Sequence, residues 1–200
     1  MAKRLLLFVH LFFAFAVLRG QNISNKKIPV EVEAAVIQAL TFFPELDDYS
    51  IEFKFRNHLN NRVMQAQPKI STLFRSKEKR HYKITMSRNL EMNDTTMTVD
   101  QLPYDILVGW FAHELGHVMD YKDRTSANLI RFAAKYLTSK PFIKKSEKRA
   151  DTYAVGNGCA KEIINTKKFI LFKSKFTKEY KAKMKDLYPS PEDITAMVEE

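Results

Sequence analysis

Cysteine is almost absent from this chain, and its absence limits how the fold can be stabilised. Cys159 is the only cysteine among 200 residues, so no disulfide bond can form within the chain. No internal repeat and no low-complexity tract is visible, and one globular domain is expected. Stability must therefore come from a packed core, for which 45% hydrophobic residues suffice, with a bound metal as a further contribution.

Long apolar runs are lacking after residue 20. The basic start "MAKR" precedes the apolar stretch "LLLFVHLFFAFAVL", and Ala14 and Ala16 provide a small-x-small cleavage site, with cleavage after Gly20 as the other position. An uncleaved anchor helix is the alternative, although the run is short for a bilayer span. We therefore expect residues 1–20 to be a signal peptide and residues 21–200 to form one secreted or periplasmic domain.

Acidic residues are in short supply. The formal net charge is +10, and it falls to +7 without residues 1–20, which hold three basic residues and no acid. Much of the excess lies in segment 167–185, where apolar residues recur at helical spacing and predict an amphipathic helix with a solvated basic face. Contact with an anionic surface is the alternative. No nucleic-acid partner is expected, because recognition motifs for one are missing. The sequence leaves the oligomeric state open.

Alternating and β-rich segments predict a small sheet in the first half of the chain. In segment 49–57 apolar residues alternate with charged ones, as is typical of a half-buried strand. Further strands are expected at 70–75 and 81–89, joined by a charged turn at 76–80. The prediction is an antiparallel sheet of about three strands, with a mixed sheet as the alternative, followed by a polar loop at 90–100.

Helical periodicity surrounds this sheet. The expected helices cover segments 29–43, 103–123, 129–137 and 142–164, and a short capped turn begins at Ser190. The helix at 103–123 is apolar on nearly every face and should be buried. The domain is therefore predicted to be α+β, with a small sheet packed on a buried helix.

The buried helix carries the sequence "HELGH" at 113–117. Residues four apart on a helix are rotated by about 400° and separated by about 6 Å, so His113 and His117 point from the same face. Both imidazoles can then bind one zinc ion (Zn2+), while Glu114 faces the open side of the metal. A zinc site needs a third protein ligand.

Segment "SEKRADTYA" provides a candidate for that ligand. Asp120 is rejected, because it lies about 10 Å along the helix from His113 and its side chain is short; a capping or supporting role suits it better. Glu147 is far enough along the chain to return on a second helix, and Asp151 shares its face and can accept a hydrogen bond from a liganding histidine. The alternative for Glu147 is a solvated glutamate in the basic run "KKSEKR". Ala150 and Gly116 would allow the two helices to approach closely.

These residues resemble a known family. His-Glu-Leu-Gly-His at 113–117 with Glu-x-x-x-Asp at 147–151 is similar to the gluzincin zinc peptidases, and the short chain resembles the minigluzincins. The resemblance implies a zincin-like fold in which His113, His117 and Glu147 bind zinc and Asp151 supports a histidine. Glu114 would be the general base and acid. It also implies that the strand at 81–89 lines the cleft and pairs with extended substrate.

The function expected from these residues is hydrolysis of peptide bonds in a peptide or protein substrate, by an endopeptidase rather than an exopeptidase. Tyr153, Tyr180 and Tyr188 are candidates for stabilising the oxyanion, without a ranking. The alternative is a secreted binding or scaffold protein with a structural or occluded zinc ion.

The C-terminal tail suggests a second possibility, which is latency. Some minigluzincins are blocked by their own terminal segment. This chain ends in Glu199 and Glu200, whose carboxylates could bind at a zinc site. The other interpretation is that Ile194, Met197 and Val198 dock a final helical turn on the core. Latency predicts that truncation before Tyr188 raises the rate of proteolysis.

Overall fold

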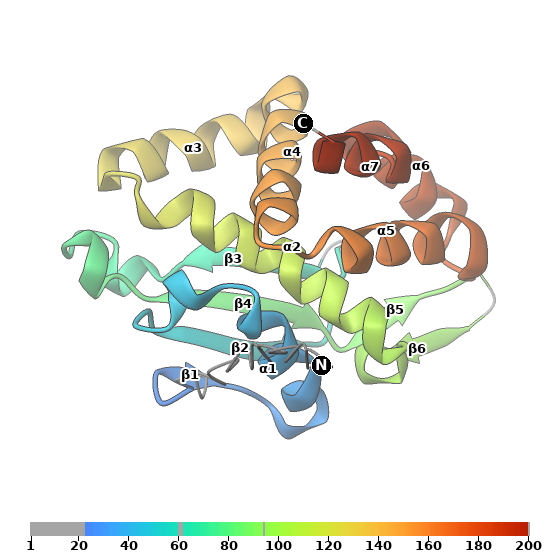
Figure 1. Cartoon of the computed structure of the whole chain (residues 1–200), viewed down its shortest axis with the longest axis horizontal. Helices are drawn as coiled ribbons and strands as arrows, with labels where there is room; N and C mark the ends of the chain where they lie inside the picture. Colours follow the sequence, from blue (N-terminus) through green and yellow to red (C-terminus); the bar gives the residue numbers. More distant parts are fainter. Residues whose placement is uncertain (1–22, 60–61, 94, 200) are drawn as a thin grey trace, which may run out of the picture.

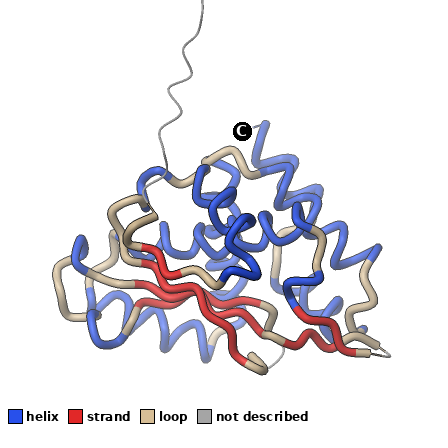
Figure 2. The backbone as a smooth tube through the Cα atoms, turned by 90° about the horizontal axis from the view of Figure 1, so that it is seen from below, coloured by secondary structure: helices blue, strands red, loops and turns tan. Residues whose placement is uncertain are grey.

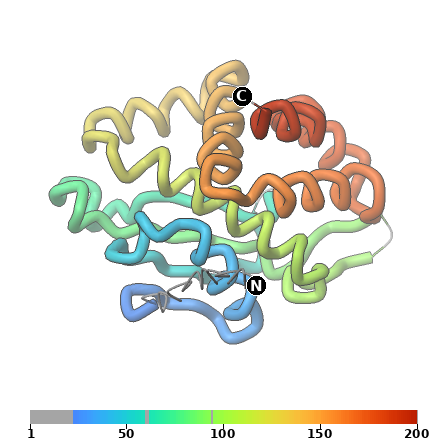
Figure 3. Tube along the Cα trace, viewed as in Figure 1, coloured from blue at the N-terminus to red at the C-terminus, as the bar shows by residue number. Residues whose placement is uncertain are grey.

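Strands come from the first half of the chain, and the second half is helical (Figure 3). The computed structural model describes residues 23–59, 62–93 and 95–199, so the predicted signal peptide lies outside the described residues. Among those described residues, no helix combines the length and apolar composition needed to cross a bilayer. The architecture is mixed α+β, as the sequence predicts.

The main sheet, whose strands are red in Figure 2, has four strands in the spatial order β1, β2, β4, β3. Their bounds are β1 Lys26–Lys27, β2 Ile51–Arg56, β3 Met64–Pro68 and β4 Tyr82–Ser87. The first three in this order are parallel, and only β3 runs antiparallel to β4. The antiparallel prediction is therefore wrong for most of the sheet and the mixed alternative is confirmed. The reason is that β4 inserts between β2 and β3, which places it parallel to β2.

Segment 70–75, predicted to be a strand, is not one. Its residues Ile70–Thr72 form a 3-10 turn, and the apolar side chains of Ile70 and Phe74 are exposed. The Thr72 hydroxyl donates to the Lys69 carbonyl at 3.1 Å, and a local bond of this kind competes with pairing in a sheet. The strand instead lies just before this turn, in the polar sequence "MQAQP" of β3, which carries little periodic signal.

The predicted loop at 90–100 is also corrected. Strands β5 Asn89–Glu91 and β6 Thr96–Thr98 pair as an antiparallel ribbon. Met92, just after β5, forms an isolated bridge with Phe176, which lies much later in the chain. Such short pairing depends on a distant partner, so the polar sequence alone did not reveal it.

Helices account for most of the remaining chain. The α-helices are α1 Glu33–Thr41, α2 Tyr104–Lys122, α3 Ser126–Thr138, α4 Lys140–Gly156, α5 Ala160–Lys168, α6 Lys178–Leu187 and α7 Pro191–Glu199. Shorter turns lie at Val30–Val32, Pro44–Leu46, Ile70–Thr72, Lys77–Lys79 and Val99–Gln101, and Phe169–Lys173 is π-helical. The predicted helices in the α1, α2 and α3 regions are confirmed. So is the cap at Ser190, whose hydroxyl accepts from the Asp193 N–H at 3.1 Å.

Two predicted helical segments are divided. Segment 142–164 breaks between α4 and α5, where Cys159 is buried as its residue type suggests. Segment 167–185 comprises the end of α5, a π-helical turn and most of α6, so it is not one amphipathic helix. Lys167, counted with the solvated basic face, is buried. Contact of this stretch with an anionic surface stays a prediction.

Helix α2 is the central element of the molecule. Every residue from Ile106 to Tyr121 is buried, as expected for a helix that is apolar on nearly every face. It packs against α1 and β3, and against α4 and α5 (Figure 1). Phe111 meets Phe53 of β2 edge to face, with ring centroids 5.8 Å apart. Because α2 has no exposed face in this middle stretch, its polar side chains must find partners inside the protein.

Candidate metal centre

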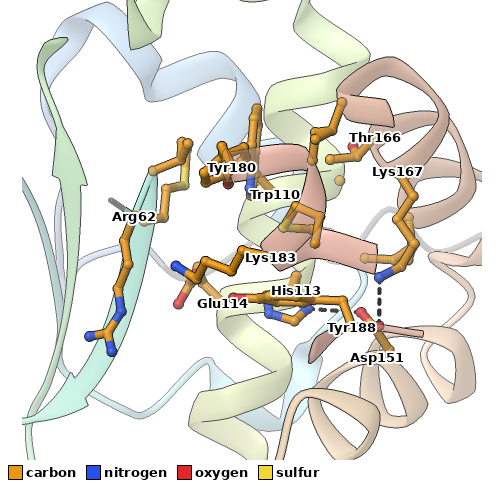
Figure 4. A pocket seen from close by; sticks show the side chains of 16 residues that line it. Arg62, Trp110, His113, Glu114, Asp151, Thr166, Lys167, Tyr180, Lys183 and Tyr188 are labelled. Carbon is orange, nitrogen blue, oxygen red and sulfur yellow. Dashed lines mark hydrogen bonds and ion pairs between the residues drawn. The ribbon is translucent and has the colours of Figure 1, made fainter. Parts of the chain in front are cut away.

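Two histidines on α2 point together into the protein, as their spacing predicts. The rings of His113 and His117 lie 4.8 Å apart between centroids and are nearly perpendicular. Both side chains are buried. Glu114, between them in sequence, is buried as well and lines the same pocket as His113 (Figure 4).

Helix α4 brings Glu147 to these histidines. One carboxylate oxygen, Oε2, lies 3.0 Å from His113 Nε2 and 3.3 Å from His117 Nε2. Glu147 is only 1% exposed, which contradicts the alternative of a solvated glutamate. The three ligand atoms lie within 4.8 Å of one another, so they converge on one position. Two imidazoles and a carboxylate match the ligand set that a catalytic zinc site uses, and this group could hold a metal ion.

The close crossing of α2 and α4 depends on glycine. A Cβ atom at Gly116 would overlap the backbone carbonyl of Ala150, which confirms the predicted close approach. Forcing atoms into a packed contact costs about 1–3 kcal/mol and moves the backbone. Glu147 reaches the histidines because this crossing is tight.

Asp151 supports His113, as the sequence predicts. Its Oδ1 lies 2.8 Å from His113 Nδ1, and its Oδ2 lies 2.9 Å from Lys167 Nζ on α5 (Figure 4). The sequence interpretation missed Lys167, because it counted this residue among solvated lysines. A signal was available: Lys167 shares a helical stripe with Ile163 and Ile170, which are both buried.

Glu147 and His117 have aromatic neighbours that sequence reasoning also missed. The Tyr136 hydroxyl on α3 donates to Glu147 Oε1 at 2.5 Å. The Tyr121 ring stacks on His117, with centroids 5.9 Å apart. Tyr136 follows Leu129 and Phe132 at helical spacing, and this pattern could have indicated an inward position. Among the described residues, His117 Nδ1 has no hydrogen-bond partner.

Asp120 is not part of the ligand group, in agreement with its rejection from geometry. Its Oδ1 lies 2.8 Å from an Arg124 nitrogen and 3.3 Å from Arg149 Nε, so it ties α2 to α4 as a supporting residue. His58 and His81, the described histidines outside the motif, are not in the ligand group either.

The pocket beside Glu114 is narrow. It has a volume of about 30 Å³, which is room for one or two water molecules. Its outer side is formed by residues of β3 and α6 with the segment next to each, namely Arg62, Val63, Met64, Tyr180, Lys183, Met184 and Tyr188. Two of the three candidate tyrosines therefore lie at the pocket, whereas Tyr153 is exposed and does not line it.

The strand beside this pocket is β3, not β4. Strand β4 is paired with β2 on one side and with β3 on the other, so it has no free edge for a substrate. The predicted role of segment 81–89 in substrate pairing is therefore wrong. Strand β3 lies at the edge of the main sheet, and the backbone of its residue Ala66 forms a hydrogen bond with Glu114.

The pKa values at the centre follow from burial and from neighbouring charges. Burial acts to lower the pKa of His113, but Asp151 and Glu147 together raise it to about 10. Burial acts to raise the pKa of Glu147, yet the two histidines hold it well below its usual range. The pKa of Asp151 is likewise lowered against its burial, mainly by Lys167. At Glu114, by contrast, burial outweighs the neighbouring charges and raises the pKa.

The C-terminal helix does not enter the pocket. In α7 the Ile194 side chain is fully buried, Met197 is half-buried, and Val198 and Glu199 are exposed. The helix packs against α4 and α5. Ile194 and Met197 therefore dock as one interpretation expects, and Glu199 is not among the residues that line the pocket.

Comparison of the chain with protein-family models, with curated proteins and with solved structures finds no match.

Proposed function

We propose that this protein is a small zinc metallopeptidase of the gluzincin type, similar to the minigluzincins, which hydrolyses internal bonds of a peptide or protein. Zn2+ would be held by His113, His117 and Glu147. The observation that carries the proposal is the convergence of these three buried ligands with Glu114 in an adjacent pocket. Export, and with it a secreted or periplasmic location, stays a prediction from residues 1–20.

A zinc ion in this position supplies a Lewis acid that polarises the scissile carbonyl and lowers the pKa of a water molecule. Glu114 is suited to take the proton of that water and pass it to the leaving amine, because burial raises its pKa. Its Oε2 is buried without a hydrogen-bond partner among the described residues and is available for this transfer. Tyr180 and Tyr188 line the pocket, and their hydroxyls are candidates to donate to the developing oxyanion.

An extended substrate has a natural place along β3. This strand is at the sheet edge, and its first residue Met64 and the preceding Val63 line the pocket. A free edge can form main-chain hydrogen bonds with an added strand, which would lay the scissile bond beside Glu114.

We propose that the protein is latent, with α6 and not the acidic C-terminal end as the segment that limits access to the pocket. A pocket of about 30 Å³ has room for water but not for a peptide side chain, and α6 borders it through Tyr180 and Met184, with Tyr188 directly after the helix. We therefore expect weak activity until α6 moves, with α7 holding α6 indirectly through the short link 188–190.

The same narrow pocket favours one alternative, a secreted binding or scaffold protein with an occluded zinc ion. The two functions differ in what Glu114 does. In a scaffold its carboxylate is dispensable, whereas in a peptidase it carries the proton transfer.

Replacement of Glu114 separates them. We expect Glu114→Gln to keep one zinc per chain and to lower the rate of cleavage of an unfolded protein by about 10²-fold or more. Glu45→Gln, at an exposed position, is the matched control and should keep the wild-type rate. Equal rates in the two variants would exclude the peptidase mechanism, and no cleavage by any form, including one that ends at Tyr188 and so lacks α7, would favour the scaffold.

A further inference from the structure

Lys167 is a charged residue in a place where charge is costly. It is 5% exposed, near the end of α5, and its Nζ lies 5.6 Å from the centre of the Tyr188 ring. Its ion pair is with Asp151, which is fully buried. A buried ion pair contributes little net stability, because desolvation offsets the attraction, and apolar residues of similar size often stabilise a core as well. Stability alone therefore does not account for a lysine here.

The contacts of Asp151 indicate what the lysine does. One carboxylate oxygen, Oδ2, is 2.9 Å from Lys167 Nζ, and the other, Oδ1, is 2.8 Å from His113 Nδ1. With each oxygen engaged by a different partner, the carboxylate cannot rotate without breaking a contact. Asp151 thus presents Oδ1 to His113 in a fixed direction, and His113 Nε2 is left facing Glu147 Oε2 at 3.0 Å.

Helix α5 is itself held firmly on α2, so the lysine starts from a fixed point. A Cβ atom at Gly109 would overlap the Glu162 carbonyl and the Thr166 hydroxyl, which shows how closely the two helices approach. The same hydroxyl donates to the Ile106 carbonyl at 3.1 Å. The backbone next to Lys167 is therefore anchored to the helix that carries the histidines.

The second histidine has no equivalent support. His117 Nδ1 is buried without a hydrogen-bond partner among the described residues. Only His113 has its Nδ1 fixed by such a chain, and a proton held on Nδ1 leaves Nε2 free to bind a metal. Of the two histidine rings, only that of His113 is oriented by side-chain contacts at Nδ1, and these contacts run from Lys167 through Asp151 to His113.

We propose that Lys167 is a positioning residue of the metal centre, which fixes Asp151 so that His113 offers Nε2 to the metal. This rests on the zinc binding proposed above. Lys167 acts through Asp151 and touches neither the metal nor the substrate.

The test measures zinc affinity of the mature chain by competition with a coloured chelator. Lys167→Met should weaken zinc binding about tenfold, the lower end of the range for residues that support a ligand. Lys167→Arg, which keeps the charge, should recover most of the affinity. Lys168→Met is the matched control, because that neighbour is exposed, and it should bind zinc as the wild type does.

A double-mutant cycle separates positioning from general stability. In an Asp151→Ala background, Lys167→Met should cause no further loss of zinc affinity, because the residue through which it acts is gone. Losses that simply add, or wild-type affinity in Lys167→Met, would overturn the inference. If Lys167→Met does not fold, Lys167→Gln takes its place, since its amide nitrogen is one bond closer to the backbone than the lysine Nζ and carries no charge to pair with Asp151. Absence of zinc from the wild type would instead contradict the proposed function.

Discussion

The two walls of the centre are built differently. The inner wall consists of Glu147 and Asp151 on α4 with Lys167 on α5, and these side chains are joined to the histidines or to one another at 2.8–3.3 Å. The outer wall consists of β3 and α6, and it meets His113 through the ring of Tyr188, with centroids 5.7 Å apart. Both walls are close to the same histidine, but only the inner one engages it with charge.

This difference separates two tasks. Breaking the inner wall leaves a buried charge unpaired, which costs several kcal/mol, so that wall is suited to hold ligands in place. Apolar and aromatic contacts of the outer wall are non-directional and can be exchanged for contacts with another apolar surface. We therefore propose that the inner wall fixes the positions of the metal ligands, and that the outer wall controls access of substrate to them.

The largest expected effect is loss of the metal from the inner side. A His113→Ala/His117→Ala double variant should lose its zinc entirely, because one carboxylate cannot hold the ion alone. A His58→Ala/His81→Ala double variant removes the same number of imidazoles outside the ligand group and should keep one zinc per chain. Metal analysis of the purified proteins decides this. Equal zinc content in both double variants would show that the centre has been assigned wrongly.

The second effect concerns pH. Because the pKa of His113 is raised from 6.5 to about 10, its proton stabilises the metal-free fold fully below pH 6.5, and this stabilisation is lost as pH rises to about 10. Zinc must displace that proton, so its apparent affinity should rise about tenfold per pH unit across this window. Chelator competition from pH 6.5 to 10 tests whether zinc affinity rises with pH. Thermal melting of the metal-free protein over the same range tests whether its stability falls. A flat affinity profile would contradict the coupling.

A smaller change is expected when only the support of Glu147 is removed. Tyr136→Phe keeps the ring but deletes the hydroxyl that donates to Glu147 Oε1, and zinc affinity should fall about tenfold. Tyr49→Phe, which is remote from the centre, is the control. Unchanged affinity in Tyr136→Phe would mean that the inner wall ends at α4 and does not extend to α3.

The smallest expected effect comes from loosening the outer wall. A chain that ends at Tyr188 lacks α7 but keeps the tyrosine that lines the pocket, and its rate of proteolysis should rise by roughly threefold or more at equal zinc content, because the open form becomes more populated. A chain that lacks only residues 198–200 is the control and should behave as the full chain does. If the control is activated equally, the acidic end blocks the site and not α6. Circular dichroism must show that both shortened chains are folded.

Much of the centre could be predicted from the chain because its spacing is local. His113 and His117 lie one helical turn apart, and so do Glu147 and Asp151, so each pair shares a face wherever its helix is placed. The all-round apolar character of α2 likewise indicated its burial. Helical period is a property of a single element, and it does not depend on what the element packs against.

Partnerships between elements were harder to predict. The order of the sheet strands, the hairpin of β5 and β6, and the break between α5 and α6 all depend on which distant segment is adjacent. The partners of Lys167 and Tyr136 were equally hard to predict. A lysine in a basic run and a tyrosine in an ordinary helix have no local sequence feature that identifies Asp151 or Glu147 as the partner.

The sequence by itself determined which side chains share a helical face, and with them two histidines, a glutamate and an aspartate of one centre. Only the tertiary structure decided that Lys167 is buried against Asp151, that β3 is an edge strand whereas β4 is not, and that α6 lines the pocket. The physical reason is that a helix repeats its geometry every few residues, whereas burial and ion pairing are set by segments that meet only after the chain has folded.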